Sequence, residues 1–121
     1  MAEAAVAHAR ANQWNVTVAI VDDGAHLLFL RRLDGASPIT AEIAMAKART
    51  AALGRRESKV YEDVIKQGRT AFLSAPLTGM LEGGVPVVVN GDVIGAVGVS
   101  GVKSDQDAAI ARAGIAALGA G

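Results

Sequence analysis

The dipeptide Asn90-Gly91 lies between two runs of mostly β-branched apolar residues, and it constrains the fold of this sequence more than any other feature. Residues 85–89 precede the dipeptide and residues 93–100 follow it. Asn and Gly readily adopt the two positive φ angles that a two-residue hairpin turn requires. The sequence therefore predicts an antiparallel hairpin here, and a fold that contains an antiparallel sheet.

A second hairpin is predicted nearer the start of the chain. Residues 16–21 are apolar on both faces, Asp22-Asp23-Gly24 is a turn sequence, and residues 26–33 form another apolar run. A further short strand is expected at residues 80–82. Because strands that are apolar on both faces must be covered on both, we expect helices on one face of the sheet and helices or another subunit on the other.

Four helices are predicted around the hairpins. Their expected ranges are 2–12, 39–54, 58–68 and 104–118. Ser37, Ser58 and Ser104 are expected to cap the last three with their hydroxyl groups. The order helix, hairpin, two helices, hairpin, helix predicts an α/β fold of the α+β kind, in a single domain over residues 1–121.

Composition argues against several classes of protein. The 12 Lys and Arg balance the 12 Asp and Glu, so the net charge of zero gives no field that would attract nucleic acid or anionic lipid. The longest apolar runs are far below the roughly 18 to 20 residues that a membrane span needs. Cysteine is absent, and the start at Met1 lacks a signal-peptide pattern. We therefore expect a cytoplasmic protein, unless a leader precedes Met1, with no nucleic-acid or membrane partner.

The apolar content predicts self-association. Hydrophobic residues make up 51% of the chain, before its 14 glycines are counted. A domain of this size leaves roughly a third of its unfolded-chain surface exposed, so these residues cannot all be enclosed in one subunit. We expect a homo-oligomer of closed symmetry.

Five blocks of the sequence carry a family resemblance. They are Val18-Ala19-Ile20-Val21-Asp22-Asp23-Gly24-Ala25-His26-Leu27-Leu28, Arg32-Leu33-Asp34-Gly35-Ala36, Lys47-Ala48-Arg49-Thr50-Ala51-Ala52, Gly83-Gly84-Val85-Pro86-Val87, and Ile94-Gly95-Ala96-Val97-Gly98-Val99-Ser100-Gly101. In this order and spacing they resemble the GlcG/HbpS family, also called the haem-degrading domain. The resemblance implies a profilin-like fold with a five-stranded antiparallel sheet flanked by helices, and higher oligomers. It also implies a small-molecule ligand: some members bind haem, and others belong to catabolic operons.

His8 and His26 are the two histidines of the chain, and a neutral imidazole is the usual protein ligand of haem iron. We consider His8 the candidate iron ligand and His26 a candidate ligand-binding residue. The alternative for His8 is a residue of the helix surface or of an interface. For His26 it is a strand residue whose ring pairs with the preceding Asp turn. No His-x-x-x-His spacing supports a protein-only metal site.

Four polar residues in apolar surroundings are further candidates. Arg31 and Arg32 alternate across a strand, so one of them points to the face opposite the other. A buried Arg needs an anion, either Glu42 or a bound carboxylate such as a haem propionate. Lys47 lies among alanines, where it either contacts a ligand or extends to solvent.

Ser100 and Gly84 complete the candidate site. Ser100 precedes the last helix, whose backbone N–H groups can help it to bind an anion. Gly84 leaves room either for a ligand or for close packing of an Ala-rich helix on the sheet. We predict that Arg32, Lys47 and Ser100 face one cavity.

Three functions remain open on these residues. The first is a small-ligand-binding protein, with haem or a related small anion as its ligand. The second is an enzyme without a cofactor, a tautomerase or hydrolase acting on a small carboxylate, in which Arg32 and Lys47 hold the anion and His8 or Glu42 moves a proton. The third is a non-catalytic regulatory oligomer.

Overall fold

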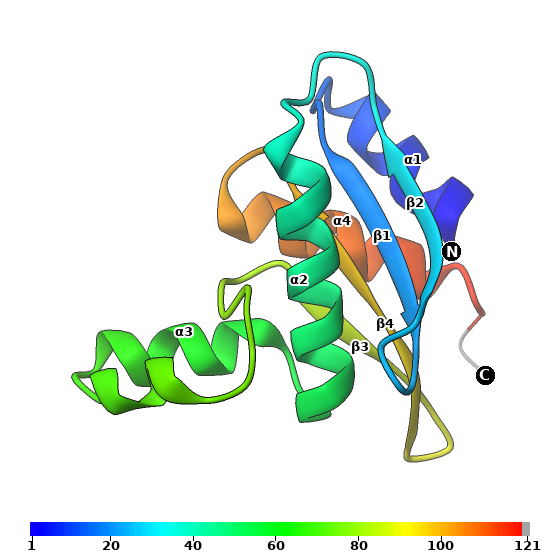
Figure 1. Cartoon of the computed structure of the whole chain (residues 1–121). Helices are drawn as coiled ribbons and strands as arrows, with labels where there is room; N and C mark the ends of the chain where they lie inside the picture. Colours follow the sequence, from blue (N-terminus) through cyan, green and yellow to red (C-terminus); the bar gives the residue numbers. More distant parts are fainter. Residues whose placement is uncertain (120–121) are drawn as a thin grey trace.

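The computed structural model describes residues 1–119 of the chain. Its helices are α1 (Ala2–Ala11), α2 (Ile39–Gly54), α3 (Ser58–Lys66) and α4 (Ser104–Ala116), with a short 3-10 helix, η1 (Thr70–Ser74), after α3. Its strands are β1 (Thr17–Asp22), β2 (Leu27–Arg32), β3 (Gly84–Val89) and β4 (Asp92–Ser100). The strands form one sheet in the order β2-β1-β4-β3, with every neighbouring pair antiparallel (Figure 1).

Both predicted hairpins are present, and they belong to the same sheet. β1 pairs with β2 and β3 pairs with β4, while β1 and β4 lie side by side in the middle. Asn90 and Gly91 have φ angles of 51° and 82°, as the predicted turn between β3 and β4 requires. The four predicted helices are also present, with ends that differ from the expected ones by at most two residues.

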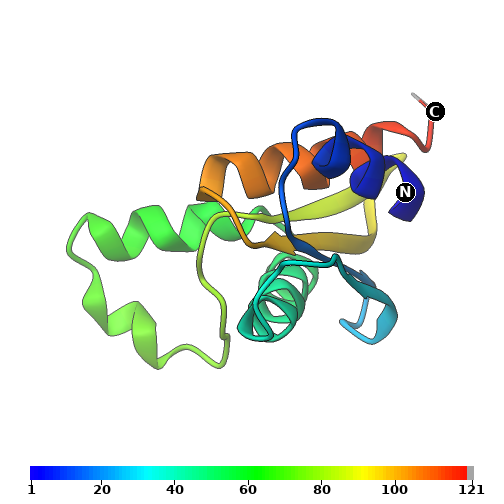
Figure 2. The same ribbon diagram turned by 90° about the horizontal axis from the view of Figure 1, so that it is seen from above.

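Helices cover both faces of the sheet. Figure 2 shows α1 and α4 on one side of the strands and α2 on the other. Val18, Ile20 and Val97 belong to the hydrophobic cluster that packs against α1 and α4. Ala19 and Ala96 belong to a second cluster, which packs against the alanines of α2. The sheet thus has a bulky face under two helices and a small-residue face under one.

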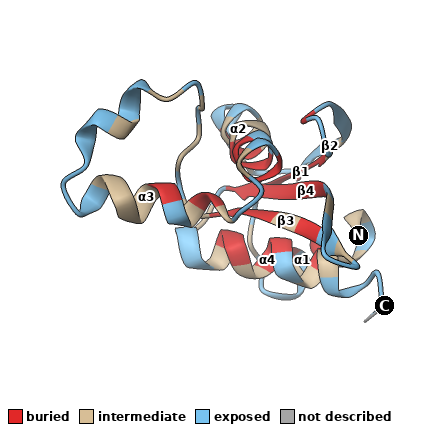
Figure 3. Cartoon of the chain, turned by 90° about the horizontal axis from the view of Figure 1, so that it is seen from below, coloured by how far each residue is buried: buried red, intermediate tan, exposed pale blue. Residues whose placement is uncertain are grey.

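The small-residue face allows α2 to approach the strands closely. A Cβ atom placed on Gly98 of β4 would collide with the backbone of Ala44 and Ala48, and one on Gly84 of β3 would collide with the Lys47 carbonyl group. Of the two explanations considered for Gly84, the structure therefore shows close packing. Figure 3 shows the resulting buried layer in the central strands and in the helix faces that cover them.

α3 and η1 form an arm that extends away from the sheet (Figures 1 and 2). Ser58 anchors the base of this arm. Its Oγ donates a hydrogen bond to the Leu81 carbonyl group and accepts one from the Gly84 N–H at 2.8 Å. Most of the arm beyond this point is exposed or half-buried.

The expectation of five strands is wrong for the described residues, which form four. The short strand expected at residues 80–82 is absent. Gly79 and Gly83 flank this segment with φ angles of 67° and 136°, which are not extended-strand conformations. The side chain of Ser58, rather than a ladder of backbone hydrogen bonds, holds the segment in place.

The three predicted serine caps are also absent, because no side-chain cap hydrogen bond is present at the start of α2, α3 or α4. The Ser58 hydroxyl is used by the loop before β3. At the start of α4, the Gln106 Oε1 accepts from the Lys103 N–H at 3.2 Å. The Asp107 Oδ1 accepts from the Val102 N–H at 3.1 Å. These side chains take the role that had been assigned to Ser104.

Candidate functional site

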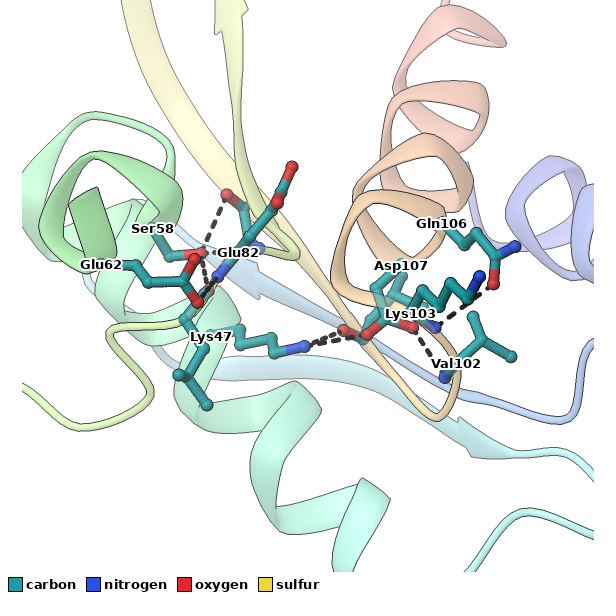
Figure 4. Close-up of polar contacts among 11 residues, drawn as sticks. Lys47, Ser58, Glu62, Glu82, Val102, Lys103, Gln106 and Asp107 are labelled. Atoms are coloured by element: carbon teal, nitrogen blue, oxygen red, sulfur yellow. Dashed lines mark hydrogen bonds and ion pairs between the residues drawn. The ribbon is translucent and has the colours of Figure 1, made fainter. Parts of the chain in front are cut away.

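Lys47 of α2 and Asp107 of α4 form a buried ion pair. The Lys47 Nζ and the Asp107 Oδ2 are 3.1 Å apart, and the two side chains are 4% and 3% exposed. Figure 4 shows the Lys47 side chain extending toward Asp107. Lys47 Nζ also donates to the Val99 carbonyl oxygen at 2.9 Å. A Cβ on Gly83, just before β3, would lie 2.8 Å from the Lys47 Nζ. A glycine at this position therefore leaves room for the Lys47 side chain. The pair joins the layers on the two faces of the sheet.

Burial dominates the electrostatics of Asp107. Removal from water raises the pKa of its carboxyl above the ordinary value of 3.8, while the Lys47 charge and the Val102 N–H act in the opposite direction. Lys47 was expected either to contact a ligand or to extend to solvent. It does not extend to solvent, and two protein oxygens already accept hydrogen bonds from its ammonium group.

Arg32 and Ser100 lie in one row of the sheet, because both are opposite Thr17 of β1. The Thr17 Oγ1 is 2.8 Å from the Thr40 Oγ1 of α2, so this row faces α2. Ser100 is 6% exposed, whereas Arg32 is exposed on the edge strand. The two residues share a face of the sheet. The predicted common cavity is not among the four described for residues 1–119, because Arg32, Ser100 and Lys47 line none of them.

Glu42 does not neutralise an arginine of β2. It is exposed on α2 and forms no ion pair with Arg31 or Arg32 within residues 1–119. The expected buried Arg–Glu contact is therefore wrong. Its physical reason is that β2 is an edge strand, where both arginines reach solvent.

His26 pairs with the turn that precedes it. Its Nδ1 is 3.1 Å from the Asp22 Oδ1, which also accepts from the backbone N–H groups of His26 and Gly24 at 2.9 and 3.0 Å. The hydrogen bond from the His26 amide contributes most to holding the pKa of Asp22 below its ordinary value of 3.8. The His26 side chain is 81% exposed. The alternative interpretation of His26 is confirmed in its pairing with the Asp turn. His26 is not a strand residue, because β2 begins at Leu27.

His8 is half-buried on α1, beside Trp14. The centroids of the two rings are 6.1 Å apart, and their planes are inclined by 56°. The structure does not assemble the proposed catalytic group. His8 belongs to a helix on one face of the sheet, and Glu42 and Lys47 belong to α2 on the opposite face (Figure 2).

The largest of the four described cavities lies between α1 and β2 and has a volume of about 740 Å³. Phe29 and Arg31 line it from β2, and Glu3, Val6 and Arg10 are among the α1 residues that line it. Ala2, Ala7 and Ala11 make up the rest of the lining. The cavity is therefore mostly apolar, with two guanidinium groups and one carboxylate.

The strand register explains why Phe29 and Arg31 face α1. Phe29 is opposite Ile20 and Arg31 is opposite Val18 on β1. Val18 and Ile20 point toward α1 and α4, and residues directly opposite one another in a sheet share a face. On the other side, Glu3 and Arg10 are seven residues apart in a helix, so they lie on the same face of α1.

Arg10 was missed as a candidate ligand-binding residue, and the predicted cavity included Arg32 rather than Arg31. The signal that could have selected Arg31 over Arg32 is the alternation of bulky and small residues in β1. Strand residues level with bulky Val18 and Ile20 face one layer, and those level with Ala19 face the Ala-rich helix α2. Nothing in the sequence distinguishes Arg10 from other polar residues of α1.

A second cavity, of about 440 Å³, lies at the arm. It is lined mainly by apolar side chains, including Ile65, Leu73 and Leu77. Glu62 and Lys66 also line it, and they pair with each other at 3.2 Å. This cavity offers an anionic ligand no unpaired cationic side chain.

Residues 1–119 contain neither of two features that would indicate other functions. No three His, Cys, Asp or Glu side chains in this range gather into a group that could hold a metal ion. Among the same residues, no helix combines the length and the apolar character needed to cross a membrane.

A family model described as "Haem degrading protein HbpS-like" matches residues 1–116. The chain belongs to this HbpS-like family. It is similar to protein GlcG of Escherichia coli strain K12, with 62% identity over 92 residues that make up 76% of this chain and 69% of GlcG. The GlcG/HbpS resemblance of the five sequence blocks is thereby confirmed.

Two solved structures related to the HbpS-like family share the fold. The crystal structure of HbpS has 35% sequence identity and a TM-score of 0.87, and the match covers 98% of this chain and 84% of that one. A crystal structure of a PduOC–haem complex has 30% identity and a TM-score of 0.87, over 99% of this chain and 90% of that one.

Proposed function

We propose that this HbpS-like chain binds a small planar anion, with haem the best candidate, in the cavity between α1 and β2. The observation that carries the proposal is the pair of guanidinium groups, Arg10 and Arg31, in the lining of an otherwise mostly apolar cavity. Support for haem itself comes from the related PduOC protein, whose structure is a complex with haem.

The cavity suits a ligand with an apolar ring and carboxylate groups. Its volume of about 740 Å³ lies within the range of about 300–1,000 Å³ that is usual for ligand pockets. Phe29 and Val6 offer apolar contacts to a ring. A guanidinium can bind a carboxylate through two parallel hydrogen bonds.

Both arginines are available for such contacts. Neither Arg10 nor Arg31 takes part in any of the ion pairs found among residues 1–119. Glu3 lies in the same lining and opposes an anion, but the two positive charges outnumber it. These residues fit the two propionates of haem, which Arg10 and Arg31 would hold while the porphyrin contacts Phe29 and Val6.

We also propose that the chain forms a homo-oligomer. β2 is an edge strand, and Leu27, Leu28 and Leu30 on it are 48%, 67% and 38% exposed. Exposed leucines on an edge strand, whose outer side has no partner strand, are typical of surfaces that another chain covers.

The experiment for the ligand site is a haemin titration followed by the haem absorption band. We expect saturable binding by the wild-type chain. Each of Arg10→Ala and Arg31→Ala should weaken it about 10-fold or more, because a hydrogen bond to a charged group contributes about 1.5–3 kcal/mol. Arg32→Ala is the matched control: it removes the same charge from the neighbouring position, on the α2 side of the strand.

The outcomes separate the two candidate faces. Loss of haemin binding in Arg31→Ala with unchanged binding in Arg32→Ala supports the cavity at α1. The reverse result would move the ligand to the α2 face, where the sequence had placed it with Arg32 and Ser100. No saturable binding by the wild-type chain would contradict the proposed function.

A further inference from the structure

The cavity between α1 and β2 contains groups for the ring and the carboxylates of a tetrapyrrole, but none for a central metal ion. We infer that the chain recognises dicarboxylic tetrapyrroles whether or not they carry iron, so that a metal-free porphyrin binds as well as haem. This inference rests on the proposed function and specifies the class of ligand.

The residues that line the cavity do not include a ligand for haem iron. Protein ligands of haem iron are side chains of His, Cys, Met or Tyr. The lining residues are three alanines, Val6, Phe29, Glu3, Arg10 and Arg31. No side chain of an iron-ligating type is among them, so affinity in this cavity comes from ring contacts and carboxylate–guanidinium hydrogen bonds.

The two histidines of the chain lie outside this lining. Arg10 and Glu3 lie on the cavity side of α1. Successive residues are separated by about 100° around a helix, so His8 lies about 140° from Glu3 and about 160° from Arg10 around α1. It is not among the residues that line the cavity. Its ring packs at Trp14 instead. The His8 imidazole therefore does not point toward a ligand bound between Glu3 and Arg10.

His26 is separated from the cavity along the strand. It precedes Leu27, the first residue of β2, whereas Arg31 is near the other end. Five residues of strand span about 16 Å. The His26 ring is also held at Asp22 in the turn, away from the α1 side chains. A tetrapyrrole whose carboxylates contact Arg31 and Arg10 does not require this imidazole.

Other residues that bind iron in proteins are occupied elsewhere in the described chain. Met1 packs against the hydrophobic cluster under α1 and α4, and Met45 packs against the alanine cluster under α2. Met80 lines the arm cavity. Tyr61 is buried on α3, with its ring 5.3 Å from that of Phe72. Each lies outside the lining of the cavity at α1.

The test compares three ligands on the full chain: haemin, metal-free protoporphyrin IX and the dimethyl ester of protoporphyrin IX. Binding is followed by the absorption of each ligand and by quenching of the Trp14 fluorescence. We expect equal dissociation constants, within fivefold, for haemin and protoporphyrin IX. The ester should bind at least 10-fold more weakly, because it has no charge for Arg10 and Arg31.

Variants make the comparison specific. His8→Ala and His26→Ala should leave the binding of both haemin and protoporphyrin IX unchanged within fivefold. Arg10→Ala and Arg31→Ala should weaken the binding of haemin and of protoporphyrin IX by the same factor. Glu3→Gln should strengthen the binding of both ligands, because it removes the negative charge from the lining.

Failure of the inference is distinguishable from failure of the proposed function. Haemin binding that exceeds protoporphyrin IX binding by more than fivefold, or that is lost in either histidine variant, would overturn the inference and leave haem binding in place. If neither ligand binds the wild-type chain, the proposed function fails.

Discussion

At the scale of single residues, the ion pair of Lys47 and Asp107 shows how costly a buried charge is. Two ions removed from water lose hydration that their mutual attraction only partly replaces, and additional hydrogen bonds are needed. The Val99 carbonyl and the Val102 N–H provide them here. A pair of this kind is tolerated as a unit, and removing one partner leaves the other uncompensated.

Lys47→Met should therefore destabilise the fold strongly. It leaves the Asp107 carboxyl group buried without a counter-charge, and we expect a loss of about 3–5 kcal/mol in the free energy of unfolding. The double variant Lys47→Met/Asp107→Asn should lose less free energy of unfolding than the sum of the losses in its two single variants. Denaturant unfolding measures all three.

The pair of Lys59 and Asp63 is the matched control, since its side chains are 44% and 39% exposed. Asp63→Asn should change stability little, because solvent screens exposed charges. Additive effects at Lys47 and Asp107, or equal losses at the buried and the exposed pair, would contradict this account.

Stability should also depend on pH through Asp107. Because its folded pKa is raised above 3.8, the folded state holds this proton more tightly than the unfolded state does. The resulting stabilisation is fully present below pH 3.8 and is lost as the pH rises through the folded pKa. The free energy of unfolding of the wild type minus that of Asp107→Asn should fall over this interval.

Unfolding curves measured from about pH 3 to about pH 7 test this sign. Asp107→Asn provides the baseline, because its side chain does not titrate. A difference that rises with pH would mean that attraction to Lys47, rather than burial, controls the pKa of Asp107.

Individual side chains were the least predictable part of the site. The sequence singled out Lys47 as unusual, but its partner is 60 residues away and on another layer, as the helix–sheet packing determines. Arg31 and Arg32 could be assigned to opposite faces, but not to particular neighbours. The pairing of His26 with Asp22 was foreseen as an alternative because it is local.

At the scale of helices and strands, the local signals were sufficient for the four helices and the two hairpins. Asn90-Gly91 placed one hairpin and Asp22-Asp23-Gly24 the other, since turn chemistry acts over a few residues. The segment at residues 80–82 was wrongly expected to be a strand. Its conformation depends on the distant Ser58 hydroxyl and on positive φ angles at Gly79 and Gly83, which sequence patterns do not reveal.

The close contact of α2 with the sheet gives a prediction at this scale. Gly98→Ala should destabilise the fold by about 3 kcal/mol or more, at the upper end of the range for overpacking, because the new methyl group meets the α2 backbone. Gly91→Ala should cost only about 1–2 kcal/mol, because its φ of 82° is unfavourable but the space around it is open.

Thermal or denaturant unfolding of the two variants separates packing from backbone conformation. The Gly91 variant serves as the control for loss of a glycine in the same hairpin. If Gly98→Ala is no more destabilising than Gly91→Ala, α2 adjusts more readily than a close-packed helix should.

At the scale of the whole molecule, the two edges of the sheet differ. β3 contains Pro86, which lacks an N–H group and so limits pairing with another strand. β2 contains no proline and exposes Leu27, Leu28 and Leu30. The proposed oligomer therefore has a more suitable contact surface at β2 than at β3.

Light scattering should give a mass that is a multiple of 12.3 kDa. Leu28→Lys should lower the mass or make it dependent on concentration, because it places a charge in the contact. Val60→Lys, which changes an apolar residue that is 40% exposed on α3, serves as the control. A mass of 12.3 kDa at all concentrations would contradict the oligomer.

The packing of α1 against α4 has a topological consequence. A Cβ atom on Gly114 of α4 would lie 3.0 Å from the Met1 carbonyl oxygen, so the N-terminal end of α1 lies against the C-terminal end of α4. A short linker can therefore join them, and new termini can be opened at exposed Gly68, whose surroundings are empty. Such a circular permutant keeps both hairpins intact and makes α4 and α1 the connection between the two central strands. We therefore expect the sheet to form as well when its two hairpins are synthesised in the opposite order.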